Sequence, residues 1–207
     1  RDYKRIYDGD LGDNTGGVGC YSPNELFNAE LKEKIAKVLK KISYGLEQEG
    51  LQYSGILFIG FMIMRGEPKI LEFNVRFGDP ETEVILPRLK SDLLCLMDKA
   101  ISHSLRSEDF QWSEETCMTV VLTSKGYPHD YEKHKRITGE ITEPTIFVYH
   151  NNTVLEEGAA YSDGGRVLSV TTMGDSLSAC REKIYAHIGE IHFDGATYRK
   201  DIGIPVE

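Results

Sequence analysis

Between residues 69 and 83 the sequence KILEFNVRFGDPETE passes from an apolar strand pattern directly into a charged loop. Side chains alternate between the two faces of a strand, so Glu72, Asn74 and Arg76 share one face. Magnesium prefers oxygen ligands and takes few of them from protein, and Glu72 and Asn74 offer two. A guanidinium at Arg76 suits a phosphate or a carboxylate. The spacing fits a metal–phosphate site, and it fits equally a solvated strand on which Glu72 and Arg76 form a salt bridge.

The residues that follow this strand add further carboxylates. Gly78 and Pro80 predict a bend, and Asp79 and Glu81 lie on it, free to hold an amine or to orient a substrate. So much charge beside an apolar strand pair favours a functional site over a plain surface.

The segment 9–23, GDLGDNTGGVGCYSP, is the second candidate. Five of its residues are glycine, and this composition predicts a loop. Successive backbone N–H groups in such a loop can bind a phosphate. The spacing matches neither the Walker P-loop nor the dinucleotide-binding fingerprint, and a flexible surface loop is the alternative.

Hydrophobic periodicity and turn residues predict the elements that must position these candidates. In order, we expect a helix at about 24–49, an antiparallel pair of strands at 53–64 and 69–77, and a helix from a Ser91 cap to about Leu105. The apolar face of the second strand, with Phe73, Val75 and Phe77, should then belong to the core.

The polar stretch 106–116 predicts a domain boundary, which divides the chain into residues 1–112 and 113–207. Beyond this boundary we expect short strands and a helix at about 176–191.

The bulk composition limits the class of protein. The 207 residues carry 24 basic and 33 acidic side chains, a net charge of −9, which argues against a general nucleic-acid or anionic-membrane binder. Four scattered cysteines form no CxxC pair, so we expect free thiols in a reducing compartment, the cytoplasm. No apolar run approaches the roughly 20 residues that span a bilayer. The chain opens without Met, and we therefore expect it to be a fragment of a longer polypeptide.

Three blocks, YDGDLGDNTGGVGCYSP, LEFNVRFGDPETEVILP and GGRVLSVTTMGDSL…YRKDIG, together resemble the glycinamide ribonucleotide synthetase (phosphoribosylamine–glycine ligase) family. This is a family of ATP-grasp enzymes of purine biosynthesis, and the resemblance runs in order from Tyr3 to Gly203. It implies an α+β fold class. Residues 1–112 would form the ATP-grasp carboxyl-terminal subdomain, an antiparallel sheet with helices, and residues 113–207 a small mixed α/β carboxyl-terminal domain.

The resemblance implies ligation of glycine to 5-phosphoribosylamine with cleavage of ATP to ADP and phosphate. ATP would phosphorylate the glycine carboxylate, and the amine of phosphoribosylamine would then attack the glycyl phosphate. Such chemistry depends mainly on positioning and on neutralising the charge of the transferred phosphoryl group. The implied partners are these three small molecules, with no nucleic acid and no membrane.

The family's metal-binding Glu and Asn fall on Glu72 and Asn74, which would hold Mg²⁺ or Mn²⁺ against the nucleotide phosphates. Around that assignment, we expect Arg76 and Asp79 to be catalytic, and Leu71 to pack on the adenine. The expected substrate-binding residues are Asp10, Asn14, Thr15, Gly16, Gly17, Glu81 and Thr82.

The sequence also departs from the family. The usual chain is about twice as long, and its amino-terminal domain and the small ATP-grasp subdomain with the glycine-rich lid are absent here. The isolated chain should therefore have little or no ligase activity without the amino-terminal half. His129 and His134 stand where glycines are expected, in a carboxyl-terminal loop whose changes should not affect the chemistry.

Two other interpretations remain open. One is another ATP-grasp carboxylate–amine ligase, against which the blocks NTGGVGCYSP and RFGDPET argue. The other is a non-catalytic nucleotide- or metal-binding module, against which the retained carboxylates and Arg76 argue.

Overall fold

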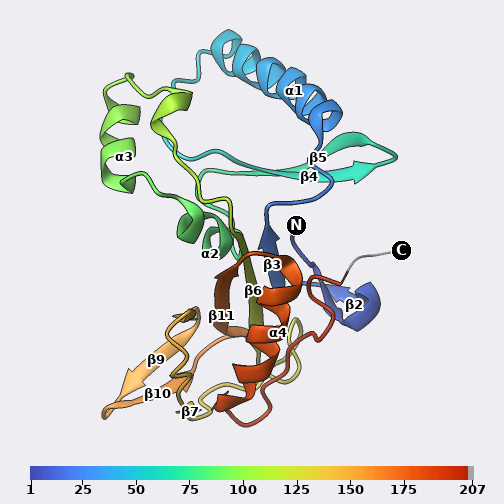
Figure 1. Cartoon of the computed structure of the whole chain (residues 1–207), viewed down its shortest axis with the longest axis vertical. Helices are drawn as coiled ribbons and strands as arrows, with labels where there is room; N and C mark the ends of the chain where they lie inside the picture. Colours follow the sequence, from blue (N-terminus) through green and yellow to red (C-terminus); the bar gives the residue numbers. More distant parts are fainter. Residues whose placement is uncertain (205–207) are drawn as a thin grey trace. The chain divides into compact units, whose positions relative to one another are not determined.

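The computed structural model describes residues 1–204, and the chain forms two compact units in it (Figure 1). Unit 1 comprises Arg1–Ser22, Asp79–Arg88 and Ser113–Glu207, and unit 2 comprises Pro23–Gly78 and Leu89–Trp112. Each unit is thus assembled from more than one segment of the chain. The predicted boundary after residue 112 coincides with one of the points at which the chain crosses from unit 2 to unit 1. The assignment of residues 1–112 and 113–207 to two family domains stays a prediction.

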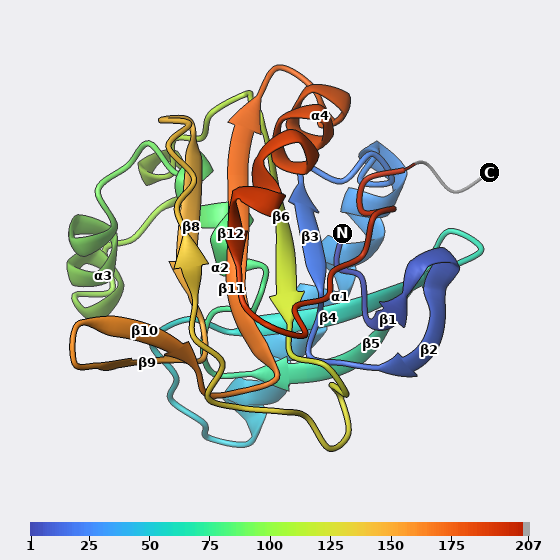
Figure 2. The same cartoon turned by 90° about the horizontal axis from the view of Figure 1, so that it is seen from below.

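A four-stranded antiparallel sheet forms the centre of unit 1. Its strand order is β3 (Gly19–Ser22), β6 (Thr116–Thr123), β11 (Arg166–Gly174) and β8 (Ile146–His150). The helix α4 (Leu177–His187) packs on β6 and β11, as Figure 2 shows. Ser176 caps this helix, because its side chain accepts a hydrogen bond from Ala179 N.

Both faces of the two central strands are buried. Met118, Val120 and Leu122 of β6 belong to the large core that includes Ile184 of α4. On the other face, Cys117 packs with Cys20 of β3 and Val84 of the short helix α2 (Thr82–Ile85). Because of this double cover, both strands are buried along most of their length, including polar residues such as Thr119 and Thr171.

The remaining elements of unit 1 are short. They are the hairpins β1 (Arg5–Tyr7) with β2 (Leu11–Asn14) and β9 (Thr153–Glu156) with β10 (Ala159–Ser162), the pair β7 (Thr138–Gly139) with β12 (Ile191–His192), and the 3-10 turns η1 (Asp8–Asp10), η2 (Leu86–Arg88) and η4 (Ile188–Glu190).

Unit 2 consists of one strand pair and two helices. The elements are α1 (Ala29–Gln48), β4 (Phe58–Met64), β5 (Glu67–Asn74), α3 (Leu93–Ile101) and the 3-10 turn η3 (Ser107–Asp109). The predicted antiparallel strand pair and both helices are confirmed; β5 begins and ends earlier than predicted, and the other three elements are shorter. The predicted Ser91 cap is wrong by one residue: Asp92 caps α3 through Cys95 N, and the Ser91 hydroxyl donates to Asp109 O instead.

The prediction that Phe73, Val75 and Phe77 lie in the core is wrong for the first two. Phe73 is 51% exposed and Val75 is 74% exposed, and Phe77 is half-buried. The cause is that β5 pairs only with β4 among the described residues, and Val75 lies beyond the last residue of β5. Among the large apolar side chains of unit 2, only Leu31 and Leu96 are buried.

The α+β fold class with antiparallel sheets is confirmed. Within residues 1–204, none of the helices has the length and apolar character needed to cross a membrane.

Because the two units bury their apolar side chains to different extents, truncating such a side chain should lower the free energy of unfolding more in unit 1 than in unit 2. Leu168→Ala removes a fully buried side chain of β11 and should lower the free energy of unfolding by about 3 kcal/mol. Phe73→Ala removes a half-exposed ring and should cost less than about 1.5 kcal/mol. Urea unfolding of the 207-residue chain, followed by circular dichroism, compares the two variants. Equal costs would show that Phe73 is packed after all.

Candidate functional site

The glycine-rich segment of unit 1 is fixed to its neighbours by backbone hydrogen bonds. Thr15 N donates to Lys4 O at 2.7 Å, and the Thr15 hydroxyl donates to the same oxygen at 2.8 Å. Val18 N donates to Tyr3 O at 2.9 Å. The segment is therefore held as a hairpin with β1 and β2, which argues against the flexible surface loop left open by the composition.

Gly16 and Gly17 lie so close to other segments that a side chain at either position would require its neighbours to move. A Cβ on Gly16 would lie 2.8 Å from Cζ of Arg166, and a Cβ on Gly17 would lie 2.5 Å from Cδ of Pro80. Gly17 also has a φ of +113°, a conformation that favours glycine.

The N–H groups of these glycines are already in use. Gly16 N donates to the Tyr127 hydroxyl at 3.0 Å, and Gly17 N donates to the Thr15 hydroxyl at 3.0 Å. The predicted phosphate-binding nest thus has no N–H available at these two residues in this conformation. Contacts with an anion would have to come from other groups of the hairpin.

Arg166, the first residue of β11, connects the glycine-rich segment to the segment that begins at Asp79. Its Nη1 lies 3.1 Å from Gly16 O and 3.0 Å from Asp79 O, and 2.8 Å from Oδ1 of the Asp79 carboxylate. The predicted residues Gly16, Gly17 and Asp79 are therefore brought together in unit 1. The sequence analysis assigned no role to Arg166, although a charged residue at the start of a predicted strand, RVLSVTT, was a usable signal.

The carboxyl groups beside Asp79 are largely buried. The pKa of Glu83 is raised to about 7, mainly by burial; the hydrogen bond from Ser169 opposes this rise, the charge of the nearby Asp79 adds to it, and the hydrogen bond from Thr119 opposes it. The Thr119 hydroxyl donates to Glu83 Oε2 at 3.2 Å. Burial also raises the pKa of Glu81, with Asp2 as the second cause.

Asp2 is itself largely buried, and this burial raises its pKa, although its ion pair with Lys4 (Nζ to Oδ2, 2.5 Å) acts in the opposite direction. Unit 1 thus concentrates carboxyl groups around Arg166.

Asp10 is held in a second ion cluster. Arg199, whose side chain is 1% exposed, donates from Nη1 to Asp10 Oδ1 at 2.7 Å and to Arg5 O at 3.0 Å. Its Nε and Nη2 bind both carboxylate oxygens of Asp201, at 2.7 and 2.6 Å. Burial opposes ionisation of Asp201, but these bonds prevail and lower its pKa. The cluster fastens the β1–β2 hairpin to the carboxyl-terminal residues.

The loop that carries the sequence departures also reaches the hairpin. His129 Nε2 lies 2.9 Å from Asp13 Oδ2, and both side chains are mostly exposed. Together with the Tyr127 contact to Gly16, this places the loop against a candidate substrate-binding segment. The expectation that its changes leave the chemistry unaffected is therefore not supported by its location.

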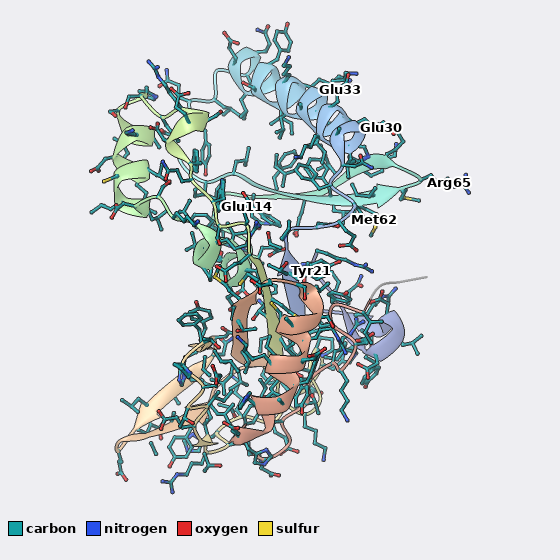
Figure 3. The ribbon with its side chains drawn as sticks, viewed as in Figure 1. Tyr21, Glu30, Glu33, Met62, Arg65 and Glu114 are labelled. Atoms are coloured by element: carbon teal, nitrogen blue, oxygen red, sulfur yellow. The ribbon has the colours of Figure 1, made fainter. Side chains whose placement is uncertain are left out.

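In unit 2, Glu72 and Asn74 share a face of the β4–β5 hairpin, as predicted. Glu72 pairs with Gly60 and Asn74 with Phe58. A Cβ on Gly60 would lie 3.0 Å from Glu72 Cγ, so the glycine leaves room for that side chain. By the alternation along β4, Met62 belongs to the same face. Met62 lies on the side of the hairpin away from α1, with Arg65 at the hairpin tip (Figure 3).

The other predicted residues of this strand are exposed. Leu71 is 60% exposed at the bulge opposite Gly60 and Phe61, and Arg76 donates from Nη1 to Phe77 O at 2.7 Å. Within residues 1–204, no group of three or more His, Cys, Asp or Glu side chains is arranged to hold a metal. One carboxylate and one amide oxygen on an open face fit Mg²⁺ or Mn²⁺, which usually keep waters and phosphates as further ligands.

Comparison with known proteins identifies the family. Residues 1–82 match the model of the phosphoribosylglycinamide synthetase ATP-grasp (A) domain, and residues 117–205 match that of the same synthetase's C domain. The chain belongs to the phosphoribosylglycinamide synthetase family. It corresponds to the carboxyl-terminal part of the synthetase, and the family membership predicted from the three sequence blocks is confirmed.

The chain is similar to curated members of the synthetase family. It is 42% identical over 202 residues to a phosphoribosylamine–glycine ligase of Caldanaerobacter subterraneus, covering 97% of this chain and 48% of that protein. It is 44% identical over 207 residues to the trifunctional purine biosynthetic protein adenosine-3 of Homo sapiens, covering 98% of this chain and 20% of that protein. The chain thus spans about half the length of the first of these relatives.

Solved structures agree. The phosphoribosylamine–glycine ligase of Thermotoga maritima superposes with a TM-score of 0.84 at 36% identity, covering 97% of this chain and 50% of that one. A biotin carboxylase from Campylobacter jejuni, at a TM-score of 0.66 and 15% identity over 91% of this chain and 42% of that one, shares the fold alone.

The buried carboxyl of Glu83 predicts a pH-dependent stability. Its pKa is raised from 4.5 to about 7 in the folded chain, so folding binds a proton. The resulting stabilisation is fully present below pH 4.5 and is lost as the pH rises to about 7. Glu83→Gln, which stays neutral, should raise the melting temperature by roughly 5 °C at pH 8 and by progressively less toward pH 4.5.

Melting curves between pH 4.5 and 8 test this for the wild-type chain and Glu83→Gln, with the exposed Glu140→Gln as the control. A Glu83→Gln effect that is the same at every pH, or that matches the control, would contradict the assignment.

Proposed function

We propose that this chain, joined to the further polypeptide that its relatives contain, ligates glycine to 5-phosphoribosylamine and forms glycinamide ribonucleotide, ADP and phosphate. The observation that carries this proposal is the identity of 41–42% over nearly the whole chain to relatives named phosphoribosylamine–glycine ligase. The same similarity favours this reaction over that of another ATP-grasp ligase or a non-catalytic module.

In the proposed reaction, a glycine carboxylate oxygen takes the γ-phosphoryl group of ATP, and ADP leaves. The amine of phosphoribosylamine then attacks the acyl carbon, phosphate leaves, and the amine loses a proton. A divalent cation neutralises phosphate charge when it is bound. Glu72 and Asn74 would hold that cation, whether Mg²⁺ or Mn²⁺, through their side-chain oxygens.

The other residues have proposed roles in binding and orientation. Arg76 is proposed to stabilise phosphoryl or carboxylate charge, which its exposed guanidinium allows. Leu71, 60% exposed, is proposed to pack on the adenine. Asp79 is proposed to orient the amine-bearing substrates; its carboxylate is ionically paired with Arg166 and still half-exposed, which supports that role.

The substrate-binding assignments from the sequence stay proposals: Asp10, Asn14, Thr15, Gly16, Gly17, Glu81 and Thr82. All of them lie in unit 1, within residues 10–17 or on the segment that begins at Asp79. Asp10 has an ion-pair partner in Arg199, so its proposed contact with substrate would be made by a carboxylate that is already oriented.

The apolar surface of unit 2 supports a need for further polypeptide. Met62 and Met64, which share one face of β4, and Leu71 and Phe73 of β5 are each about half exposed or more. So much exposed apolar surface on one hairpin is typical of an interaction site. We propose that the amino-terminal half found in the relatives covers it and completes the enzyme.

A cytoplasmic location is also proposed. All four cysteines, Cys20, Cys95, Cys117 and Cys180, are free, and only Cys95 is exposed. Free thiols suit a reducing compartment.

The isolated 207-residue chain should form no measurable glycinamide ribonucleotide from ATP, glycine and phosphoribosylamine. The polypeptide extended by the amino-terminal half of the family should form it. Product and ADP are measured together for both polypeptides. Turnover by the isolated chain would refute the need for the other half, and failure of a folded extended polypeptide would refute the proposed reaction.

The metal assignment predicts a selective defect. In the extended polypeptide, Glu72→Gln and Asn74→Ala should each lower kcat by about 100-fold at fixed Mg²⁺, since each removes one metal-ligand oxygen. Their apparent requirement for Mg²⁺ should rise. Glu67→Gln, on the same strand, is the control. Normal magnesium-dependent turnover in both variants would disprove the assignment.

A further inference from the structure

We propose that Arg166 is a positioning residue of this ligase: it fixes the Gly16–Gly17 backbone and the Asp79 carboxylate in one arrangement, and thereby sets the binding of the acceptor substrates. The expected effect on substrate binding rests on the proposed function. The expected effect on the position of the two segments rests only on contacts within unit 1.

One guanidinium nitrogen serves two chain segments. Nη1 of Arg166 lies 3.1 Å from Gly16 O, 3.3 Å from Gly17 O, 3.0 Å from Asp79 O and 2.8 Å from Asp79 Oδ1. These partners are 150, 149 and 87 positions away in the sequence. Both segments carry residues to which substrate binding is assigned, so this side chain decides how the two are placed with respect to each other.

The location of Arg166 is set by the core sheet. Arg166 pairs with Thr123 of β6, whereas Leu168 pairs with Leu122, so the register shifts by one residue between them. A β-bulge of this kind changes the direction in which a side chain leaves the end of a paired strand. Val167 and Leu168 are fully buried, which anchors the arginine backbone. The side chain extends from a rigid strand rather than from a mobile loop.

The contact with Gly16 is reciprocal. A Cβ at that position would lie 2.8 Å from Cζ and 2.9 Å from Nη2 of Arg166, so the guanidinium keeps its place only if residue 16 has no side chain. The arginine side chain is 17% exposed, and the pKa values of Asp2 and Glu83 both respond to its charge. Loss of the guanidinium would leave these carboxyl groups without that compensation.

Lysine cannot replace this arginine fully. All four contacts of Arg166 are made by Nη1, which stands at the end of a side chain one atom longer than that of lysine. The ammonium of a lysine would keep the charge but would stop short of the place of Nη1. Arg166→Lys therefore keeps the positive charge and removes the hydrogen bonds of Nη1, so its effects report on those bonds alone.

The kinetic test uses the extended polypeptide. Arg166→Lys should raise the KM for glycine about tenfold and lower kcat, while the KM for ATP changes less than about twofold. The matched control is Arg88→Lys, because Arg88 also donates to backbone carbonyls, those of Glu115 and Ser113, in unit 1. A merely structural arginine would affect the two substrates alike, as the control is expected to do.

A double-mutant cycle tests the reciprocal contact. Gly16→Ala should impair glycine use in the wild type by displacing the guanidinium, and should add less than about twofold in the Arg166→Lys background. If Gly16→Ala impaired glycine use by the same factor in both backgrounds, Gly16 would not act through Arg166.

Hydrogen exchange of the 207-residue chain gives a readout that needs no activity. Arg166→Lys should speed amide exchange at residues 12–18 and 81–83, and Arg88→Lys should not. If exchange is unchanged and the KM for glycine stays normal, the proposal is wrong. If the wild-type extended polypeptide fails to make glycinamide ribonucleotide, the proposed function is wrong, and the exchange result still decides whether Arg166 positions these segments.

Discussion

The hydrogen bonds and ion pair of Arg166 are the interaction on which the candidate site of unit 1 depends. They need three conditions at once: a buried β11 that fixes the arginine backbone, a residue 16 without a Cβ, and an aspartate at position 79. Each condition is met by a different part of the sequence. Their coincidence makes a glycine-rich hairpin, which has little packing of its own, part of an ordered surface.

The two units differ in how completely they bury their apolar residues. Unit 1 has a sheet covered on both faces, and unit 2 has a two-stranded hairpin whose apolar side chains stay largely exposed. Three or more strands, or full cover by helices, are normally needed to stabilise such a hairpin. The proposed metal ligands Glu72 and Asn74 lie on this less protected unit, and we propose that further polypeptide covers it in the complete enzyme.

Local patterns predicted the elements well and the long-range contacts poorly. The alternation along residues 69–77 predicted correctly that Glu72 and Asn74 share a face, because side-chain direction in a strand is a local property. The same alternation failed for Phe73 and Val75, because burial depends on what covers the strand. The Asp92 cap was missed in favour of Ser91, since both residue types can cap and sequence alone does not choose between neighbours.

The role of Arg166 could not be found from spacing, because its partners lie 87 to 150 positions away. The contacts of Tyr127 and His129 with the glycine-rich hairpin were missed for the same reason. The resemblance to the family, by contrast, was carried by long contiguous blocks, and the domain models match residues 1–82 and 117–205, which contain most of those blocks.

The role of Arg166 is tested most directly by a crystal structure of the extended polypeptide with glycine and a non-hydrolysable ATP analogue. Glycine is expected to bind against Gly16, Gly17 and Asp79, with Arg166 still bonded to both segments. Glycine bound elsewhere, or an Arg166 side chain turned away from the Gly16 and Asp79 carbonyls in the substrate complex, would contradict this role.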